Sequence, residues 1–109
     1  MLEPILGSVN AEKVLIYLFV REKGYPREIA NFYDINVRAI QNQLEKFENG
    51  GIVVSFLLGK IRLYQFSPRY VFLPELTKLL EKAFSFYPEE EIERLKMNRR
   101  RPRRTGKPL

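Results

Sequence analysis

The residue types that most enzyme chemistry requires are missing from this chain. Its 109 residues include no cysteine and no histidine, which excludes thiolate nucleophiles, imidazole bases and the usual zinc, haem and copper ligands. The clustered acids Glu89, Glu90, Glu91 and Glu93 favour a solvated helix start over a defined cation site. Paired-carboxylate, serine-centred and glycine-rich phosphate signatures do not occur. The sequence therefore predicts a protein that is not an enzyme and that holds neither a metal nor a cofactor.

The remaining charged chemistry is cationic and lies at one end. The formal net charge is +6, but residues 94–109 carry eight of the nineteen lysines and arginines and no acid. Residues 1–93 hold the other eleven cations and all thirteen acids, so their net charge is −2. We therefore expect a nearly neutral folded domain over residues 1–98 and a flexible basic tail over residues 99–109.

Capping signals and apolar periodicity predict the elements that must position this chemistry. The chain is long enough for one domain, and 45% of its residues are hydrophobic. Ser8 or Asn10 can cap a first helix, Pro26 opens a second, and Asn36 caps a third. Helices are expected at 11–23, 27–33 and 36–49, a hairpin at 52–58 and 61–66, and further helices from Pro74 to Pro88 and from Glu89 onward.

This order of elements resembles the winged helix-turn-helix domain of the ArsR-like and MarR-like prokaryotic transcription regulators. Residues 27–30 match the "x-E-I-A" second helix of that family, and residues 36–53 match its recognition helix and "L-x-x-L-x-x-x-G-L-V" exit. Residues 59–64 resemble its "G-R-x-x-x-Y" wing, and residues 72–80 resemble a segment that follows the wing in small prokaryotic winged-helix proteins. The resemblance spans roughly 70 residues. It implies a mainly α fold with a β-hairpin wing and additional C-terminal helices.

The resemblance also implies double-stranded DNA as the partner and transcription regulation as the role. The helix at 36–49 would enter the major groove, where Arg38, Gln41 and Asn42 would read bases from one side of the helix. Phosphate or minor-groove contacts would come from the cations Arg27, Lys46, Lys60, Arg62, Arg99, Arg100, Arg101, Arg103 and Arg104. The metal sensing of many ArsR-like proteins is not expected here, because cysteine and histidine are absent.

Two apolar segments leave alternatives open. The stripe of Leu76, Leu79, Leu80, Ala83 and Phe84 predicts a homodimer seam, although the same helix could instead complete the core of its own domain. The hairpin is unusually apolar, so it either packs against another element or subunit or presents an interaction surface at its tip. The second reading would suit a protein-interaction adaptor or an RNA-binding module that uses the hydrophobic wing and the basic tail.

Targeting signals do not change these expectations. The apolar stretch from Val14 to Val20 is far shorter than a bilayer span, and the first twenty residues lack the features of a signal peptide. The sequence therefore predicts a cytoplasmic protein with no membrane association.

Overall fold

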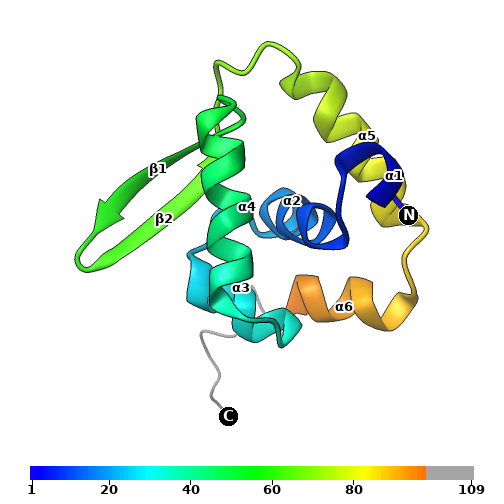
Figure 1. Ribbon diagram of the computed structural model, residues 1–109. Coiled ribbons are helices and arrows are strands. Elements are labelled where there is room, and N and C mark those ends of the chain that lie inside the picture. Colours follow the sequence, from blue (N-terminus) through cyan, green and yellow to red (C-terminus); the bar gives the residue numbers. More distant parts are fainter. Residues whose placement is uncertain (98–109) are drawn as a thin grey trace.

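Six helices and one two-stranded hairpin make up the part of the chain that the computed structural model describes, residues 1–97 (Figure 1). In chain order they are α1 (Glu3–Leu6), α2 (Val9–Arg21), α3 (Pro26–Tyr33), α4 (Val37–Asn49), β1 (Val53–Leu58), β2 (Ile61–Phe66), α5 (Leu73–Ser85) and α6 (Glu89–Met97). The short helix α1 had no counterpart in the sequence-based expectations. The predicted class, mainly α with a β-hairpin wing and additional C-terminal helices, is confirmed.

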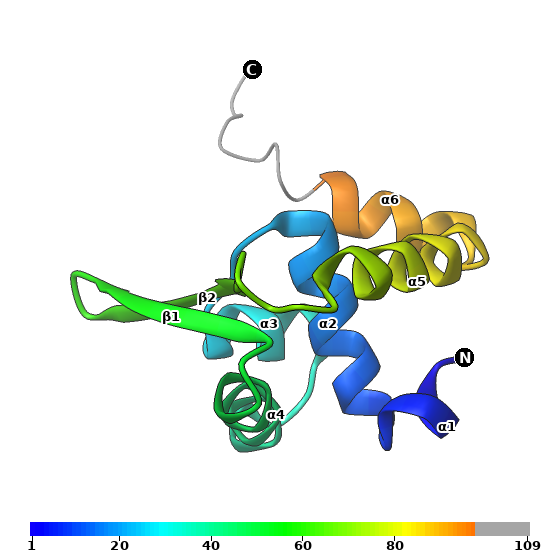
Figure 2. The same ribbon diagram turned by 90° about the horizontal axis from the view of Figure 1, so that it is seen from above.

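Helix α2 is the central element, and it is apolar on all sides. Eight of its thirteen residues are buried, and it contacts α1, α3, α4, α5, α6 and β2. Ser8 caps its start, because the hydroxyl oxygen accepts a hydrogen bond of 3.0 Å from the backbone N–H of Ala11. The helix ends two residues before the expected Lys23, since Glu22 adopts a positive φ of 74°. Figure 2 shows α3 and α4 on one side of α2 and the C-terminal helices on the other.

Helices α3 and α4 form the predicted helix-turn-helix unit. Pro26 occupies the first turn of α3, and Asp34 ends that helix in the left-handed conformation. Asn36 then caps α4, where its side-chain oxygen accepts a hydrogen bond of 2.7 Å from the N–H of Arg38. Ile40 and Leu44 of α4 are fully buried. The apolar stripe of α4 thus faces the core, and the opposite face of the helix remains in solvent.

The hairpin extends away from the helices as a narrow ribbon (Figures 1 and 2). Its strands pair in one register from Val53 opposite Phe66 to Leu58 opposite Ile61, and Gly59 enters the turn with a φ of +64°. Gly24 fastens the base of the hairpin through two backbone hydrogen bonds with Tyr64, of 2.8 and 3.1 Å. A Cβ on Gly24 would lie 2.9 Å from Cε1 of Tyr17, so a glycine is needed for this close approach.

Helix α5 belongs to the core of its own chain, which corrects part of the expected dimer seam. The side chains of Leu80 and Ala83 are 0% and 4% exposed, in one cluster with the residues of α2. Leu76, Leu79 and Phe84 are partly buried against the same cluster. Because α2 presents apolar side chains on all sides, α5 and α6 must cover the side that α3 and α4 leave open. Leu80 and Ala83 are therefore inaccessible to a second subunit.

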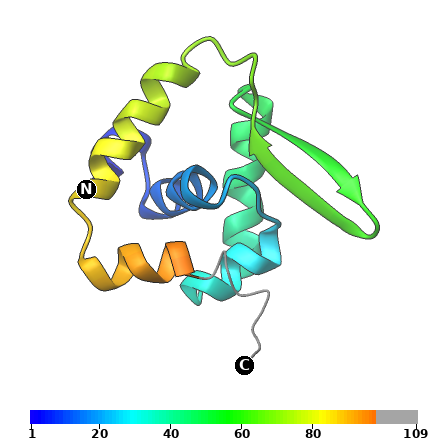
Figure 3. The ribbon, with the colours of Figure 1, turned by 180° about the vertical axis from the view of Figure 1, so that it is seen from behind.

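Helix α6 lies beside α2 (Figure 3), and two arginines attach it to the rest of the domain. The Nε of Arg21 donates a hydrogen bond of 2.8 Å to the carbonyl oxygen of Leu95, and its Nη1 donates one of 2.8 Å to the hydroxyl of Tyr17. The guanidinium of Arg94 lies 4.1 Å from the ring centroid of Phe32 and donates to the carbonyl oxygen of that residue. The end of α6 is thereby held against α2 and α3.

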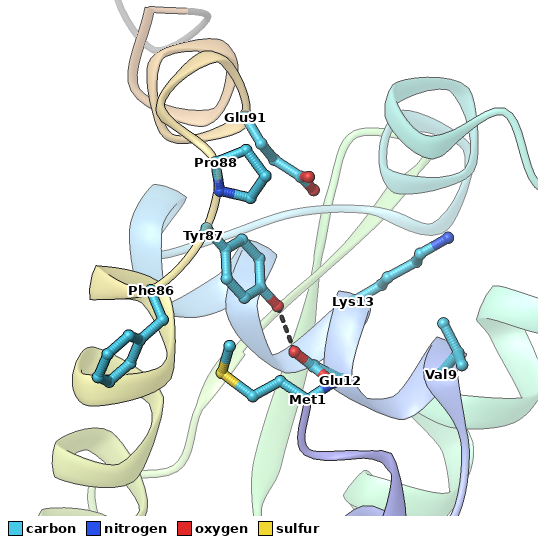
Figure 4. A pocket seen from close by; sticks show the side chains of 8 residues that line it. All are labelled: Met1, Val9, Glu12, Lys13, Phe86, Tyr87, Pro88 and Glu91. Atoms are coloured by element: carbon cyan, nitrogen blue, oxygen red, sulfur yellow. Dashed lines mark hydrogen bonds and ion pairs between the residues drawn. The ribbon is translucent and has the colours of Figure 1, made fainter.

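Glu12 connects the start of the chain with the α5–α6 junction. This carboxylate, 6% exposed, accepts hydrogen bonds from the N–H of Leu2 at 2.8 Å, from the N-terminal amine at 3.2 Å and from the hydroxyl of Tyr87 (Figure 4). Burial acts to raise the pKa of Glu12, but the three donated hydrogen bonds outweigh it and hold the pKa below its usual 4.5. The charged form of Glu12 is therefore the form that stabilises the fold.

The burial of Leu80 leads to a prediction about stability. We expect Leu80→Ala to lower the free energy of unfolding by about 2–5 kcal/mol, because it removes fully buried methyl groups and leaves a cavity. The matched variant Leu57→Ala, at a side chain 61% exposed, should change it by less than about 0.5 kcal/mol. Urea titration followed by circular dichroism measures both. If the loss of unfolding free energy in Leu80→Ala varied with protein concentration, Leu80 would instead lie in a subunit interface.

The lowered pKa of Glu12 gives a second prediction. The stabilisation from the carboxylate is present at neutral pH, and it is lost as the pH falls below about 4.5 through the folded-state pKa. We expect Glu12→Gln to be less stable than the natural chain at pH 7 and the two to converge toward pH 3. Urea titrations at both pH values test this, and a difference that stays constant between them would contradict it.

Candidate nucleic-acid interface

The solvent-facing side of α4 carries all three residues predicted to read bases. Arg38, Gln41 and Asn42 are exposed, while the apolar stripe of the same helix is turned inward. Their spacing of three and four residues places Arg38 beside both of the others on the helix surface. Lys46 follows one turn after Asn42, and its Nζ lies 5.5 Å from the ring centroid of Phe47. This face is therefore free to meet a partner along its length.

A hollow of about 380 Å³ lies where α4, the start of α3 and the hairpin meet. We call it the cationic hollow, and it is lined by Tyr25, Pro26, Arg27, Val37, Gln41, Lys60, Ile61 and Arg62. The fold thus brings Arg27 of α3 and Gln41 of α4 together with Lys60 and Arg62 of the hairpin, and no acid lines the hollow. Arg38, Asn42 and Lys46 are not among the residues that line this hollow. Tyr25, Pro26 and Val37 had not been predicted as part of the site.

A short chain of hydrogen bonds joins the end of α4 to the hairpin. The hydroxyl of Ser55 donates to Oε2 of Glu48 at 2.7 Å and accepts from Nη1 of Arg62 at 3.0 Å. The pairing of Leu57 with Arg62 in the strand register brings Ser55 within reach, because residues two apart in a strand share a face. Sequence reasoning missed Glu48 and Ser55 as positioning residues. The turn at Gly59 and Lys60 sets the register of the two strands, and that register could have placed Ser55 near Arg62.

The hairpin surface is apolar and carries only positive charge. Val54, Phe56, Leu58 and Ile61 share one face of the ribbon by register, and their side chains are 38%, 38%, 63% and 40% exposed. From Val53 to Phe66 the only charged residues are Lys60 and Arg62. This exposure is consistent with an interaction surface at the tip, whereas packing of the hairpin against another element of the same chain, the other expected alternative, does not fit it.

A second hollow, of about 300 Å³, lies on the other side of the molecule, between the N-terminal residues and the α5–α6 junction (Figure 4). Its lining residues are Met1, Val9, Glu12, Lys13, Phe86, Tyr87, Pro88 and Glu91, and we call it the junction hollow. It differs from the cationic hollow because it carries charges of both signs, Lys13 and Glu91 as well as Glu12. Exposed apolar side chains surround it, including Phe86 at 66%.

Several other expectations concern the ends of the chain and bound ions. The tail arginines Arg99, Arg100, Arg101, Arg103 and Arg104 lie outside the described residues. Within residues 1–97, no group of three or more acids is arranged to hold a metal ion. No helix in this part of the chain combines the length and apolar character needed to cross a membrane.

Comparison with known proteins defines the class of this chain. No family model matches it, and no curated protein matches it. Among solved structures it is similar to a mutant of Lactococcus lactis ZitR in its apo form, with a TM-score of 0.55 and 18% sequence identity over 78% of this chain and 73% of that one. The likeness, together with the helix-turn-helix unit and the hairpin, defines a winged-helix protein. At this identity the likeness concerns the fold alone.

Proposed function

We propose that this chain is a sequence-specific double-stranded DNA-binding protein that regulates transcription. The observation that carries the proposal is the cationic hollow, in which Arg27, Lys60 and Arg62 meet Gln41 beside the exposed face of α4. Three cations, one from α3 and two from the hairpin, line a hollow that no acid lines, and this arrangement suits a polyanion. An adjacent helix face rich in arginine and amide side chains suits the edges of bases.

The proposed docking follows from the positions of these residues. Helix α4 enters the major groove, where Arg38, Gln41 and Asn42 contact purine edges. Arg27, Lys60, Arg62 and Lys46 contact the flanking phosphates, and the arginines beyond residue 98 add further phosphate contacts. Glu45 lies on the exposed side of α4 as well, so it would repel phosphate unless it accepts a hydrogen bond from the amino group of cytosine.

The exposed apolar hairpin favours a second candidate function, a protein-interaction adaptor. Leu57 and Leu58 are 61% and 63% exposed, and residues 1–93 have a net charge of −2, which gives this part of the chain little general attraction for nucleic acid. Selection of duplexes from a random library by the full chain distinguishes the two candidates. Enrichment of one sequence motif supports the regulator. A selected pool that stays random contradicts the regulator. RNA that competes for the protein as well as duplex DNA does also contradicts it.

Base reading by α4 generates the third prediction. We expect Arg38→Ala and Asn42→Ala each to weaken binding to the selected duplex by about 1–3 kcal/mol, with little change on a scrambled duplex, because base contacts carry the specificity. Lys82→Ala, an exposed cation on α5, is the control and should change neither affinity. Gel shifts at two salt concentrations measure these effects. Equal losses on both duplexes would remove Arg38 and Asn42 from the base-reading role.

We infer that the regulator acts as a homodimer through the surface around the junction hollow. Met1, Val9 and Phe86 line this hollow and are 63%, 46% and 66% exposed, so the chain leaves a large apolar surface uncovered there. Lys13 and Glu91 line the same hollow, so a two-fold axis could place each beside its opposite charge in the other subunit. Such a dimer would present two α4 helices to successive major grooves.

The dimer surface leads to the fourth prediction. We expect Phe86→Glu to give a monomer with unchanged helicity, because it places a charge in an apolar contact between subunits without touching the core. Phe72→Glu is the matched control, since Phe72 is 60% exposed at the start of α5, away from the junction hollow. Sedimentation and circular dichroism measure both properties. A natural chain that already sediments as a monomer at micromolar concentration would contradict the inference.

A further inference from the structure

We propose that the tip of the hairpin is an apolar wedge that enters the minor groove of the bound duplex, separates neighbouring base pairs and bends the DNA. The tip consists of Leu57, Leu58, Gly59, Lys60 and Ile61. This inference rests on the proposed function, because it requires a duplex held by α4. It goes beyond that function by assigning a mechanical role to side chains that read no base edge.

The shape and exposure of the tip suit insertion into a narrow space. Leu58 and Ile61 face each other across the turn, on the same face of a two-stranded ribbon, and are 63% and 40% exposed. Leu57, 61% exposed, lies on the opposite face of the same tip. Large apolar side chains therefore project on both faces of the ribbon. Leucine and isoleucine are among the residues that separate base steps when they are inserted from the minor groove.

The charges around the tip select its partner. Lys60 lies in the turn, Arg62 follows one residue after Ile61, and Nζ of Lys23 lies 6.0 Å from the ring centroid of Phe56. The hairpin carries no acid, so two copies of this surface would bring like charges together. The surface around the junction hollow differs because it holds both signs. An apolar tip bordered only by cations fits a partner with anionic edges and a stacked apolar interior, which describes duplex DNA.

The tip also has a fixed position relative to α4. The base of β2 is bonded to Gly24, and Arg62 is connected through Ser55 to Glu48 near the end of α4. Lys60, Ile61 and Arg62 line the cationic hollow together with Gln41, so the tip continues the surface that α4 presents. A duplex seated on α4 would therefore meet the tip without a rearrangement of the domain. The cations at the tip would neutralise phosphates on either side of the inserted leucine.

The experiment uses the full chain and the duplex selected from the random library. Fluorophores at the two ends of the duplex report bending, and 2-aminopurine at successive positions beside the α4 site reports unstacking. We expect a bend of about 20–90° and a severalfold rise in 2-aminopurine fluorescence at one step. Leu58→Ser combined with Ile61→Ser should reduce both signals while the duplex remains bound. Val71→Ser, at a side chain 75% exposed in the connection between β2 and α5, should leave both unchanged.

Four other outcomes would contradict the proposal that the tip is a wedge. A bound duplex that stays straight, with 2-aminopurine fluorescence unchanged at every position, rejects the wedge and leaves the proposed function in place. Failure to select any duplex rejects both the wedge and the proposed DNA-binding function. A change in sedimentation for Leu58→Ser in the absence of DNA assigns the tip to self-association instead. Leu57→Ser is an independent variant of the tip, and it should also reduce the bend and the 2-aminopurine signal. Loss of both signals in Val71→Ser as well would show an effect that is not specific to the tip, and it would contradict the wedge.

Discussion

The burial of α2 on all sides is the constraint on which the rest of the structure depends. A helix with apolar side chains around its whole circumference is stable in water only when other elements surround it. Helices α3 and α4 and strand β2 contact it on one side, and α5 and α6 complete the enclosure. Helices α3 and α4 and the hairpin, which form the cationic hollow, are thereby all held against α2. Gly24, which is hydrogen-bonded to β2, lies close against the ring of Tyr17 in α2 because it has no side chain.

Polar contacts add specificity to this apolar arrangement. Glu12 joins α2 to the N-terminal residues and to Tyr87, and Arg21 joins it to the last turn of α6. A buried carboxylate without donors would cost several kcal/mol, so these partners must meet for the helices to pack as they do. Helix α6, whose apolar stripe is short, is consequently attached by hydrogen bonds to backbone carbonyls and by arginine–aromatic contacts as well as by Leu95.

The domain has two exposed apolar surfaces that differ in charge. The surface at the junction hollow combines Lys13 with Glu91, and the hairpin carries cations alone. Charge of both signs allows a surface to meet its own copy, whereas one sign directs it to an oppositely charged partner. This difference connects the two proposals, since a dimer formed at the first surface would leave both hairpins and both α4 helices available to one duplex.

The sequence by itself determined the local elements. The cap at Asn36, the proline at the start of α3, the turn at Gly59 and the apolar stripe of α4 act over a few residues, so the helix-turn-helix unit and the hairpin were predicted closely. The boundaries of α2 were less accurate, because the positive φ of Glu22 depends on how the chain turns toward Gly24. The exposed positions of Arg38, Gln41 and Asn42 also followed from helical periodicity alone.

Tertiary structure alone decided which distant residues meet and which apolar residues remain exposed. Periodicity identifies an apolar face but not what covers it, so the sequence could not distinguish a dimer seam at Leu80 from a core contact. The meeting of Arg27 with Lys60 and Arg62, and the contact of Glu48 with Ser55, depend on how α3, α4 and the hairpin pack around α2. Such contacts join residues far apart in the chain, and local signals do not encode them because their geometry is set by the packing of whole elements.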